Sequence, residues 1–234
     1  MGDILDNKPP FTIIMGCDGC GKTTWKRANR EALATIHIDL DSIADGIGNW
    51  DDEECRDEAL RFSEAKIAEC LREHQPYGVE STYSGQRGPN QVKLAKQHGY
   101  RIHGYYLGTS SPEINIERIN QRVRERTGHW VDPKSIPNRW AFSLSNLKKT
   151  VELFDELTIY DNSLDYNLGV EEPPTMAFFE RGYGMLLVKD NEIPEWFSQW
   201  HTGWEARKFE LDRAARKRES AKARVKGSEP PKRD

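Results

Sequence analysis

The sequence predicts an α/β fold of the doubly wound type, in which helices cover both faces of a mainly parallel sheet. Short runs rich in β-branched and aromatic residues alternate with segments of helical periodicity between residues 11 and 161. A glycine-rich loop joins the first of these runs to the first helical segment. The length of 234 residues suits one medium-sized core with additions.

The glycine-rich loop reads GCDGCGKT from Gly16 to Thr23 and follows the apolar run FTIIM. It fills every fixed position of the pattern G-x-x-x-x-G-K-[ST], the phosphate-binding loop (P-loop). Gly16 and Gly21 let the backbone curl so that its N–H groups face a phosphate, and the helix opening at Lys22 adds its dipole. Lys22 is expected to reach the β- and γ-phosphates of ATP, and the Thr23 hydroxyl to bind Mg²⁺. The predicted nucleotide contacts are Gly16, Cys17, Asp18, Gly19, Cys20, Gly21, Lys22, Thr23 and Thr24.

Cys17 and Cys20 form a C-x-x-C pair inside this loop. A zinc site takes four ligands, and the other cysteines, Cys55 and Cys70, lie on a predicted helix without paired spacing. We therefore interpret the loop cysteines as small residues at variable positions, although their oxidation would deform the loop. Few cysteines, no secretory segment and no apolar run of membrane-spanning length predict a reduced, soluble, cytoplasmic protein.

The remaining elements follow in alternation. Strands are expected over residues 35–39, 77–82, 100–107 and 157–161. Helices are expected over 53–74 and 91–97, from Pro112 toward Gly128, and over 134–154. In doubly wound folds, ligands bind at the carboxyl ends of the strands.

Acidic residues gather at those strand ends. Asp39 and Asp41 are read as closing the second strand, and Glu80 and Thr82 as closing the third. A carboxylate within hydrogen-bond reach of an acceptor hydroxyl can orient it and take its proton, and Asp41 is the predicted general base. Glu80, on the strand expected beside the P-loop strand, is assigned to a metal-bound water or the acceptor. Asp39 is either a substrate contact or a residue that caps a helix or orders the loop.

A cluster of arginines follows on the helix that begins at Pro112. Their side chains precede a Gly- and Pro-containing segment, and residues 122–133 are predicted to form a mobile lid. A charged helix is commonly a solvated face, but guanidinium groups on a closing lid stabilise charge on a transferring phosphoryl group. One or two of five arginines are predicted to be catalytic, without a choice among them: Arg118, Arg122, Arg124, Arg126 and Arg139.

The C-terminal part is predicted to hold a hairpin, over 175–180 and 183–188, and a helix on which Trp196, Trp200 and Trp204 form a docking stripe. Residues 1–204 would then form the kinase domain. Residues 205–234 would form a basic, partly helical to disordered tail of net charge +5. The rest of the chain carries −9, which does not favour broad nucleic-acid binding. The basic tail suits either a solvated helix or a contact with nucleic acid or an acidic partner protein.

Several ordered segments together resemble the small zeta-toxin-like P-loop kinases. They are GCDGCGKTT, HIDLDSIAD, GVESTYSG, YYLGTSSPEINIERINQRV, GHWVDP followed by NRWAFSLSNL, and IYDNS, from about Phe11 to Ser163, with a fainter match at 192–196. The resemblance implies an ATP- and Mg²⁺-dependent kinase that phosphorylates the 3′-hydroxyl of the sugar in UDP-N-acetylglucosamine. It also implies a possible antitoxin protein as partner.

The resemblance also carries residue roles. It implies Lys22 and Thr23 as nucleotide and metal contacts, Asp41 as general base, Glu80 and Thr82 as substrate contacts, and Arg122 as the lid-side arginine. This chain departs from the pattern in having Ser84 where the toxins have an arginine, and in having Trp130 near their second catalytic arginine. The second role is expected to pass to Arg139 or His129, and Glu80 is the second candidate metal ligand beside Thr23.

Three other functions fit the same loop. A polynucleotide 5′-hydroxyl kinase would use the basic tail to hold the phosphate backbone. Another small-molecule phosphotransferase would differ only in its acceptor. A slow regulatory ATPase would retain the loop and leave Asp41 dispensable.

Overall fold

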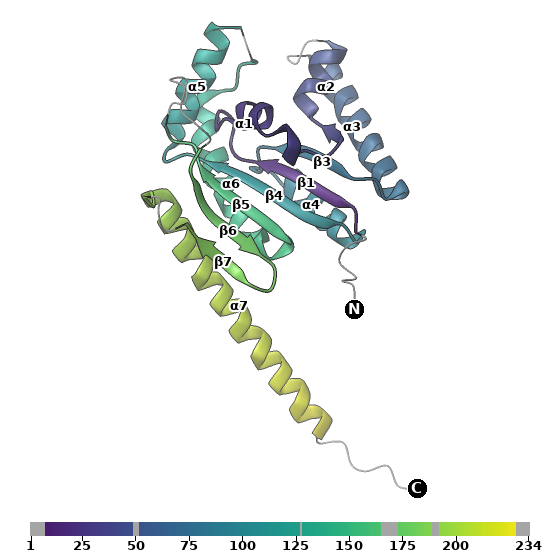
Figure 1. Ribbon diagram of the computed structural model, residues 1–234, viewed down its shortest axis with the longest axis vertical. Coiled ribbons are helices and arrows are strands. Elements are labelled where there is room, and N and C mark those ends of the chain that lie inside the picture. Colours follow the sequence, from purple (N-terminus) through teal and green to yellow (C-terminus); the bar gives the residue numbers. More distant parts are fainter. Residues whose placement is uncertain (1–7, 49–51, 127, 165–172, 189–191, 228–234) are drawn as a thin grey trace.

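The computed structural model describes residues 8–48, 52–126, 128–164, 173–188 and 192–227. Within this part of the chain, seven strands form one sheet in the order β2-β3-β1-β4-β5-β6-β7 (Figure 1). The first five strands in chain order pair in parallel, whereas β6 and β7 pair antiparallel. The strands are β1 (Pro10–Met15), β2 (Ile36–Ile38), β3 (Tyr77–Ser81), β4 (Arg101–Gly108), β5 (Glu156–Asp161), β6 (Thr175–Glu180) and β7 (Gly184–Leu187).

Helices connect these strands in the expected alternation. They are α1 (Lys22–Ala28), α2 (Leu40–Ile47), α3 (Glu53–Glu73), α4 (Arg87–Gln97), α5 (Pro112–Arg124), α6 (Ile136–Thr150) and α7 (Glu195–Gly227), with 3₁₀ turns η2 (Arg30–Ala32), η3 (Pro133–Ser135) and η4 (Val151–Leu153). The doubly wound α/β fold is therefore confirmed. Several boundaries differ from expectation: α4 begins earlier, at Arg87, and α5 ends earlier, at Arg124. The expected helix over 134–154 is an α-helix with a 3₁₀ turn at each end.

The side chains of β1 alternate between two cores. Phe11, Ile13 and Met15 are fully buried in the larger core, which α3, α4, α6 and the start of α7 cover. Ile14 points to the opposite face and packs in a second core with Trp25 of α1. Because β1 is covered on both faces, its sequence is a continuous apolar run, as is typical of a central parallel strand.

The expected strand end at Asp39 and Asp41 was wrong, whereas the capping alternative given for Asp39 is confirmed. The strand β2 ends at Ile38, and Asp41 lies in the first turn of a helix, α2, that the sequence analysis did not anticipate. Asp39 is the N-cap of that helix, since its carboxylate accepts a hydrogen bond from the Asp41 backbone N–H at 3.2 Å. The cap gives the Asp41 backbone N–H an acceptor at the start of the helix, where the helix itself offers none.

The hairpin and the tryptophan helix are as expected. β6 pairs with β5 and extends the sheet, and Trp196, Trp200 and Trp204 are all buried. The indole of Trp200 donates to the Leu144 carbonyl at 3.0 Å, which fixes α7 on α6. Gly108 in β4 leaves room for the Trp196 ring, because a Cβ at this position would overlap it.

The helix α7 continues to Gly227, well beyond the body (Figure 1). Its side chains from residue 210 to 218 are exposed, and Phe209 is 67% exposed. In the described parts of the chain, no helix is long and apolar enough to span a membrane. The part of the tail expected to be disordered, at 228–234, lies outside the described residues.

We expect deletion of residues 210–234 to leave the midpoint of thermal unfolding unchanged within roughly 2 °C, because exposed positions contribute little to stability. Deletion from Trp200 onward removes two buried indoles and should lower the midpoint clearly. Circular dichroism melts of the two truncations and the full chain test the proposed boundary of the domain near 204. A large loss in the shorter deletion would place the boundary further along α7.

Candidate active site

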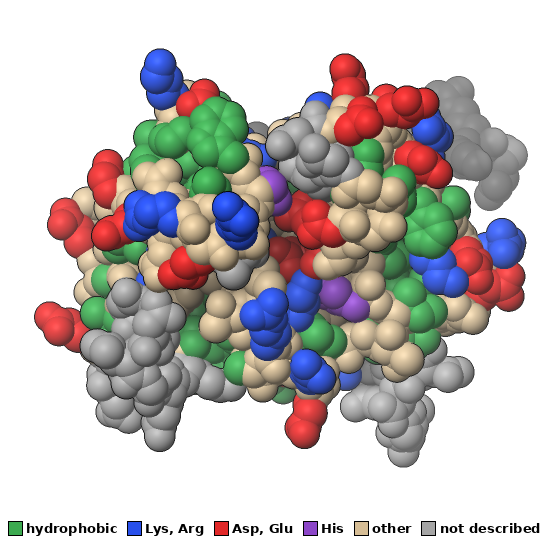
Figure 2. Space-filling model, turned by 90° about the horizontal axis from the view of Figure 1, so that it is seen from above, with side chains coloured by type: hydrophobic (Ala, Val, Ile, Leu, Met, Phe, Trp, Pro, Cys, Tyr) green, Lys and Arg blue, Asp and Glu red, His purple; other side chains and the backbone are tan. Residues whose placement is uncertain are grey.

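A cavity of about 1260 Å³ lies at the carboxyl ends of the parallel strands. Seen from above, it is a hollow with acidic side chains and a histidine near its centre and basic side chains around it (Figure 2). Its lining brings together most of the residues singled out in the sequence: Asp18, Gly19, Gly21, Lys22, Thr23, Thr24, Asp39, Asp41, Glu80, Thr82, Arg122, His129 and Arg139. Gly16, Cys17 and Cys20 belong to the same loop but do not line the cavity.

The P-loop conformation requires its glycines. Gly16, Gly19 and Gly21 have φ angles of 143°, 76° and 97°, which side chains with a Cβ rarely adopt. A Cβ on Gly19 would also lie 2.5 Å from the Asn115 carbonyl oxygen. The loop is therefore shaped as a backbone cradle ahead of α1, the arrangement that binds phosphate groups.

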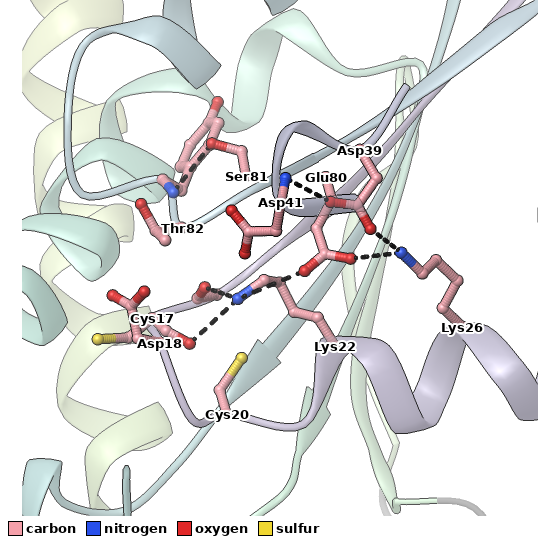
Figure 3. Close-up of polar contacts among 12 residues, drawn as sticks. Cys17, Asp18, Cys20, Lys22, Lys26, Asp39, Asp41, Glu80, Ser81 and Thr82 are labelled. Atoms are coloured by element: carbon pink, nitrogen blue, oxygen red, sulfur yellow. Dashed lines mark hydrogen bonds and ion pairs between the residues drawn. The ribbon is translucent and has the colours of Figure 1, made fainter. Parts of the chain in front are cut away.

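The Lys22 side chain is 7% exposed and curls back over this cradle. Its ammonium donates to the carbonyl oxygens of Gly16 at 2.8 Å and Cys17 at 3.3 Å, and lies 3.9 Å from the Glu80 carboxylate (Figure 3). Burial disfavours the ammonium, but nearby acidic groups, among them Glu80 and Asp18, outweigh burial and hold the pKa of Lys22 above its usual value. Lys22 is therefore a fixed positive charge at the cradle.

Two asparagines brace the loop from behind. Asn115 of α5 donates to the Asp18 carbonyl oxygen at 2.6 Å and accepts from the Thr109 hydroxyl at 2.5 Å. Asn162, after β5, donates to the Cys20 carbonyl oxygen at 2.7 Å. Both side chains are buried, so these bonds hold the cradle in place without competing water. Sequence reasoning missed both residues, although each lies in a segment that carries the family resemblance.

Lys26, one turn after the loop, joins two acidic residues that the sequence left separate. Its ammonium contacts the carboxylate of Asp39 and that of Glu80, the latter at 2.9 Å (Figure 3). Burial disfavours the Asp39 carboxylate, but hydrogen bonds from Lys26 and Ser42 hold the pKa of Asp39 below its usual value. Asp39 and Glu80 therefore meet at one ammonium group, and Glu80 also lies beside Lys22 of the P-loop.

Asp41 lies across the cavity from the cradle. Its carboxylate points into the space between Thr82 and Lys22 (Figure 3). Asp41 is an exposed residue, but the protein around its carboxylate still removes part of its hydration. The charges of Asp39 and Glu80 also repel it, so the pKa of Asp41 is raised despite the opposing effects of His129 and Lys22. A carboxylate with a raised pKa is a better proton acceptor than an ordinary aspartate.

Thr82 lies on a strained loop after β3. Tyr83 has a φ of 57°, which is rare for an aromatic residue, and is fully buried. Its hydroxyl hydrogen-bonds Thr150 at 2.8 Å, and its carbonyl accepts from Asn146 at 2.9 Å. These contacts hold the loop so that Thr82 and Ser84, whose hydroxyls are 2.9 Å apart, both line the cavity.

The arginines differ in their surroundings. Arg118 donates to the carbonyls of Asn162 and Leu164, and so ties α5 to the segment after β5. Arg139 pairs with Asp18 of the P-loop at 3.0 Å. Arg122 lines the cavity against the backbone of Gly128, where a Cβ would come within 3.3 Å of its Nε. Arg124 and Arg126 are exposed and do not line the cavity.

The cysteines do not form a reactive pair. Cys17 and Cys20 are free thiols, 2% and 1% exposed. Burial raises the pKa of Cys17 to about 12 and also raises the pKa of Cys20. Because the thiolate is the form that ligates metals and attacks disulfides, both side chains behave as small apolar residues under the loop.

A family model described as an AAA domain matches residues 11–136, which is more than half of the chain and contains the P-loop, Asp41, Glu80 and Arg122. The chain belongs to this family. This AAA domain is also similar to an uncharacterised protein of Haemophilus influenzae, with 30% identity over 137 residues that cover 58% of this chain and 95% of the relative.

Among solved structures, this chain is similar to a chain from the PezAT chromosomal toxin–antitoxin system of Streptococcus pneumoniae. That match has a TM-score of 0.54 and 18% identity, and covers 90% of each chain. A structure of AvrRxo1-ORF1:-ORF2 with ATP matches with a TM-score of 0.57 and 11% identity, over 78% of this chain and 61% of the other. At these identities the likeness concerns the fold. The resemblance to zeta-toxin-like P-loop kinases is confirmed at that level, and the AAA domain has a P-loop kinase-like fold.

The asparagine brace gives a testable consequence. Asn162→Ala should lower the free energy of unfolding by about 1–3 kcal/mol, because the Cys20 carbonyl loses a buried donor. We also expect weaker ATP binding, since the cradle is no longer held in its binding shape. Denaturant unfolding and nucleotide titration measure the two effects. The matched variant Asn90→Ala, at an exposed position, should change neither.

Proposed function

We propose that this protein is an ATP- and Mg²⁺-dependent kinase that transfers the γ-phosphoryl group of ATP to a hydroxyl of a small molecule. The observation that carries the proposal is the placement of Asp41. A slow ATPase needs only the cradle, whereas a kinase also needs a base for the acceptor hydroxyl. Asp41 shares the cavity with Lys22 and has a raised pKa.

In the proposed reaction, the backbone of residues 16–23 and the Lys22 ammonium hold the phosphates of ATP. Asp41 accepts the proton of the acceptor hydroxyl as that oxygen attacks the γ-phosphorus and the bond to the β-phosphate oxygen breaks. Glu80 and Thr82 orient the acceptor, with Asp39 or His129 as further contacts. Arg122, and secondarily Arg139, stabilise negative charge on the transferring group.

The residues fit a magnesium ion held partly by phosphate. The exposed Thr23 hydroxyl and the Glu80 carboxylate line the same cavity. In the described part of the chain, no group of three or more His, Cys, Asp or Glu side chains forms an all-protein metal site. Mg²⁺ commonly takes one or two protein ligands and completes its shell with water and phosphate oxygens. When bound, it would neutralise charge on the β- and γ-phosphates.

For the acceptor, we propose a sugar nucleotide such as UDP-N-acetylglucosamine. The cavity volume of about 1260 Å³ exceeds the roughly 300–1,000 Å³ of ordinary small-molecule pockets, which suits ATP together with a sizeable second substrate. The family resemblance supports this class of acceptor. The toxin–antitoxin origin of one similar structure supports a protein partner as a further proposal.

The test is to incubate the full chain with Mg-ATP and UDP-N-acetylglucosamine, beside a panel of other hydroxyl compounds and a 5′-hydroxyl oligonucleotide. Mass spectrometry should find one added phosphate on the sugar nucleotide. Phosphorylation of the oligonucleotide alone would favour a polynucleotide kinase. Hydrolysis of ATP without any acceptor product would overturn the kinase proposal.

A further inference from the structure

Arg87 is a charged residue of the cavity to which the proposed mechanism gives no role. It is the first residue of α4, and its side chain is half-buried at the cavity wall. Its guanidinium donates to the Ser63 hydroxyl at 2.6 Å. Ser63 is 1% exposed and donates in turn to the Leu60 carbonyl at 2.8 Å, so its lone pair is directed at Arg87. The guanidinium is thus held in one orientation.

This positive charge has no direct ion-pair partner in the described part of the chain. Within the described residues, no carboxylate lies within ion-pair distance of Arg87. Burial lowers the pKa of Arg87, and the charge of Glu64 offsets this only partly. A desolvated guanidinium with donors left over is the usual partner of a phosphate or carboxylate group.

The position of Arg87 assigns it to the acceptor side of the cavity. Strands β3 and β4 lie on opposite sides of the P-loop strand β1. Arg87 follows β3, as Glu80 and Thr82 do, whereas Arg122 follows β4 and lies on the lid side. A phosphate bound by the P-loop therefore has Arg122 on one side. On the other side lies the part of the cavity wall that contains Arg87.

That wall is polar and preorganised. Thr82, Ser84 and Gln91 line the cavity with Arg87, and the strained Tyr83 backbone holds the loop between them. The first turn of α4 is packed tightly, because a Cβ on Gly88 would lie 2.5 Å from the Ser81 hydroxyl. Hydroxyl groups that line the same cavity as a guanidinium offer a ligand both neutral and charge-assisted hydrogen bonds.

We propose that Arg87 is a specificity-determining residue that binds an anionic group of the acceptor, at a subsite with Ser84 and Gln91. The inference rests on the proposed kinase function and names a property of its acceptor: a phosphate or carboxylate group apart from the reacting hydroxyl. A neutral acceptor offers the Arg87 guanidinium no anionic group and therefore binds weakly.

The test separates binding from catalysis. Full-length protein saturated with Mg²⁺ and a non-hydrolysable ATP analogue is titrated by calorimetry with UDP-N-acetylglucosamine, inorganic pyrophosphate and neutral N-acetylglucosamine. Arg87→Gln should weaken binding of an anionic probe roughly ten- to hundredfold and leave the neutral sugar unaffected. Arg87→Lys should recover part of the loss. Arg61→Gln, an exposed position on α3 outside the cavity, is the matched control.

Failure of this inference differs from failure of the proposed function. If sugar-nucleotide phosphorylation proceeds with the same KM in Arg87→Gln as in wild type, the kinase stands and the subsite is wrong. If anionic probes bind in an Arg87-dependent way but no acceptor is phosphorylated, the subsite stands and the kinase proposal falls. If the wild type binds no anionic probe beside the nucleotide analogue, the subsite is also wrong. Thermal melts of each variant confirm that it is folded.

Discussion

Asp41→Asn is expected to lower the rate of phosphoryl transfer by roughly 10²- to 10⁴-fold, the usual contribution of a general base. ATP binding should be retained, because the cradle and Lys22 are untouched. Asparagine has nearly the same shape as aspartate but does not take the proton of the acceptor hydroxyl. The measurement is single-turnover transfer to the acceptor identified in the panel, with nucleotide affinity titrated in parallel.

Stability provides the control for this variant. A carboxyl group whose pKa is raised in the folded state favours folding when protonated, and this contribution is lost as pH rises through the raised value. Loss of the Asp41 charge should therefore cost no stability at neutral pH, and Asp41→Asn should melt no lower than wild type. Asp45→Asn, exposed on the same helix and outside the cavity, should keep full activity. Normal transfer by Asp41→Asn would remove Asp41 as the base.

The pH profile gives a second signature of the same group. Transfer by the wild type should fall on acidification through the raised pKa of Asp41, at a higher pH than an ordinary aspartate with a pKa of about 3.9 would give. The residual activity of Asp41→Asn should lack that limb. A limb that persists unchanged in the variant would assign the titration to another group.

The sequence predicted those features that depend on local pattern. The apolar run of β1, the glycine positions of the loop and the tryptophan spacing of α7 each encode an element in consecutive residues. The helix α2 was missed because it is short and because its cap, Asp39, directly follows β2. Residues 39–41 were therefore interpreted as the end of a strand. Asp41 nevertheless lines the expected cavity.

Contacts between residues far apart in the sequence could not be predicted from such local patterns. Lys26 meets Glu80 across 54 positions of sequence, and Asn162 meets Cys20 across 142. Tyr83 takes a backbone conformation that sequence patterns assign to glycine, because buried bonds to Thr150 and Asn146 stabilise it. Tertiary hydrogen bonds between such segments set the fine geometry of the site, and a single sequence does not reveal them.

Arg122→Gln is expected to reduce the rate of transfer roughly 10³-fold, with a smaller change in ATP affinity, since arginines that act on the transferring group contribute 10³ or more. The choice of Arg122 among five arginines follows from the family resemblance, which implies it as the lid-side arginine, and from its place in the cavity lining. Arg118 is committed to two backbone carbonyls, and Arg139 is paired with Asp18. Arg122 lines the cavity beside Gly128, opposite the acceptor wall.

Three companion variants turn this choice into a measurement. Arg124→Gln removes the same charge from the exposed side of the α5 terminus and should leave transfer unchanged. Arg139→Gln leaves Asp18 without its partner, so we expect weaker ATP binding together with a smaller loss of rate. Arg122→Lys keeps the charge but loses the planar fork and should recover little activity. If Arg139→Gln abolished transfer while Arg122→Gln retained it, the catalytic role would belong to Arg139 on α6 and not to Arg122 on α5.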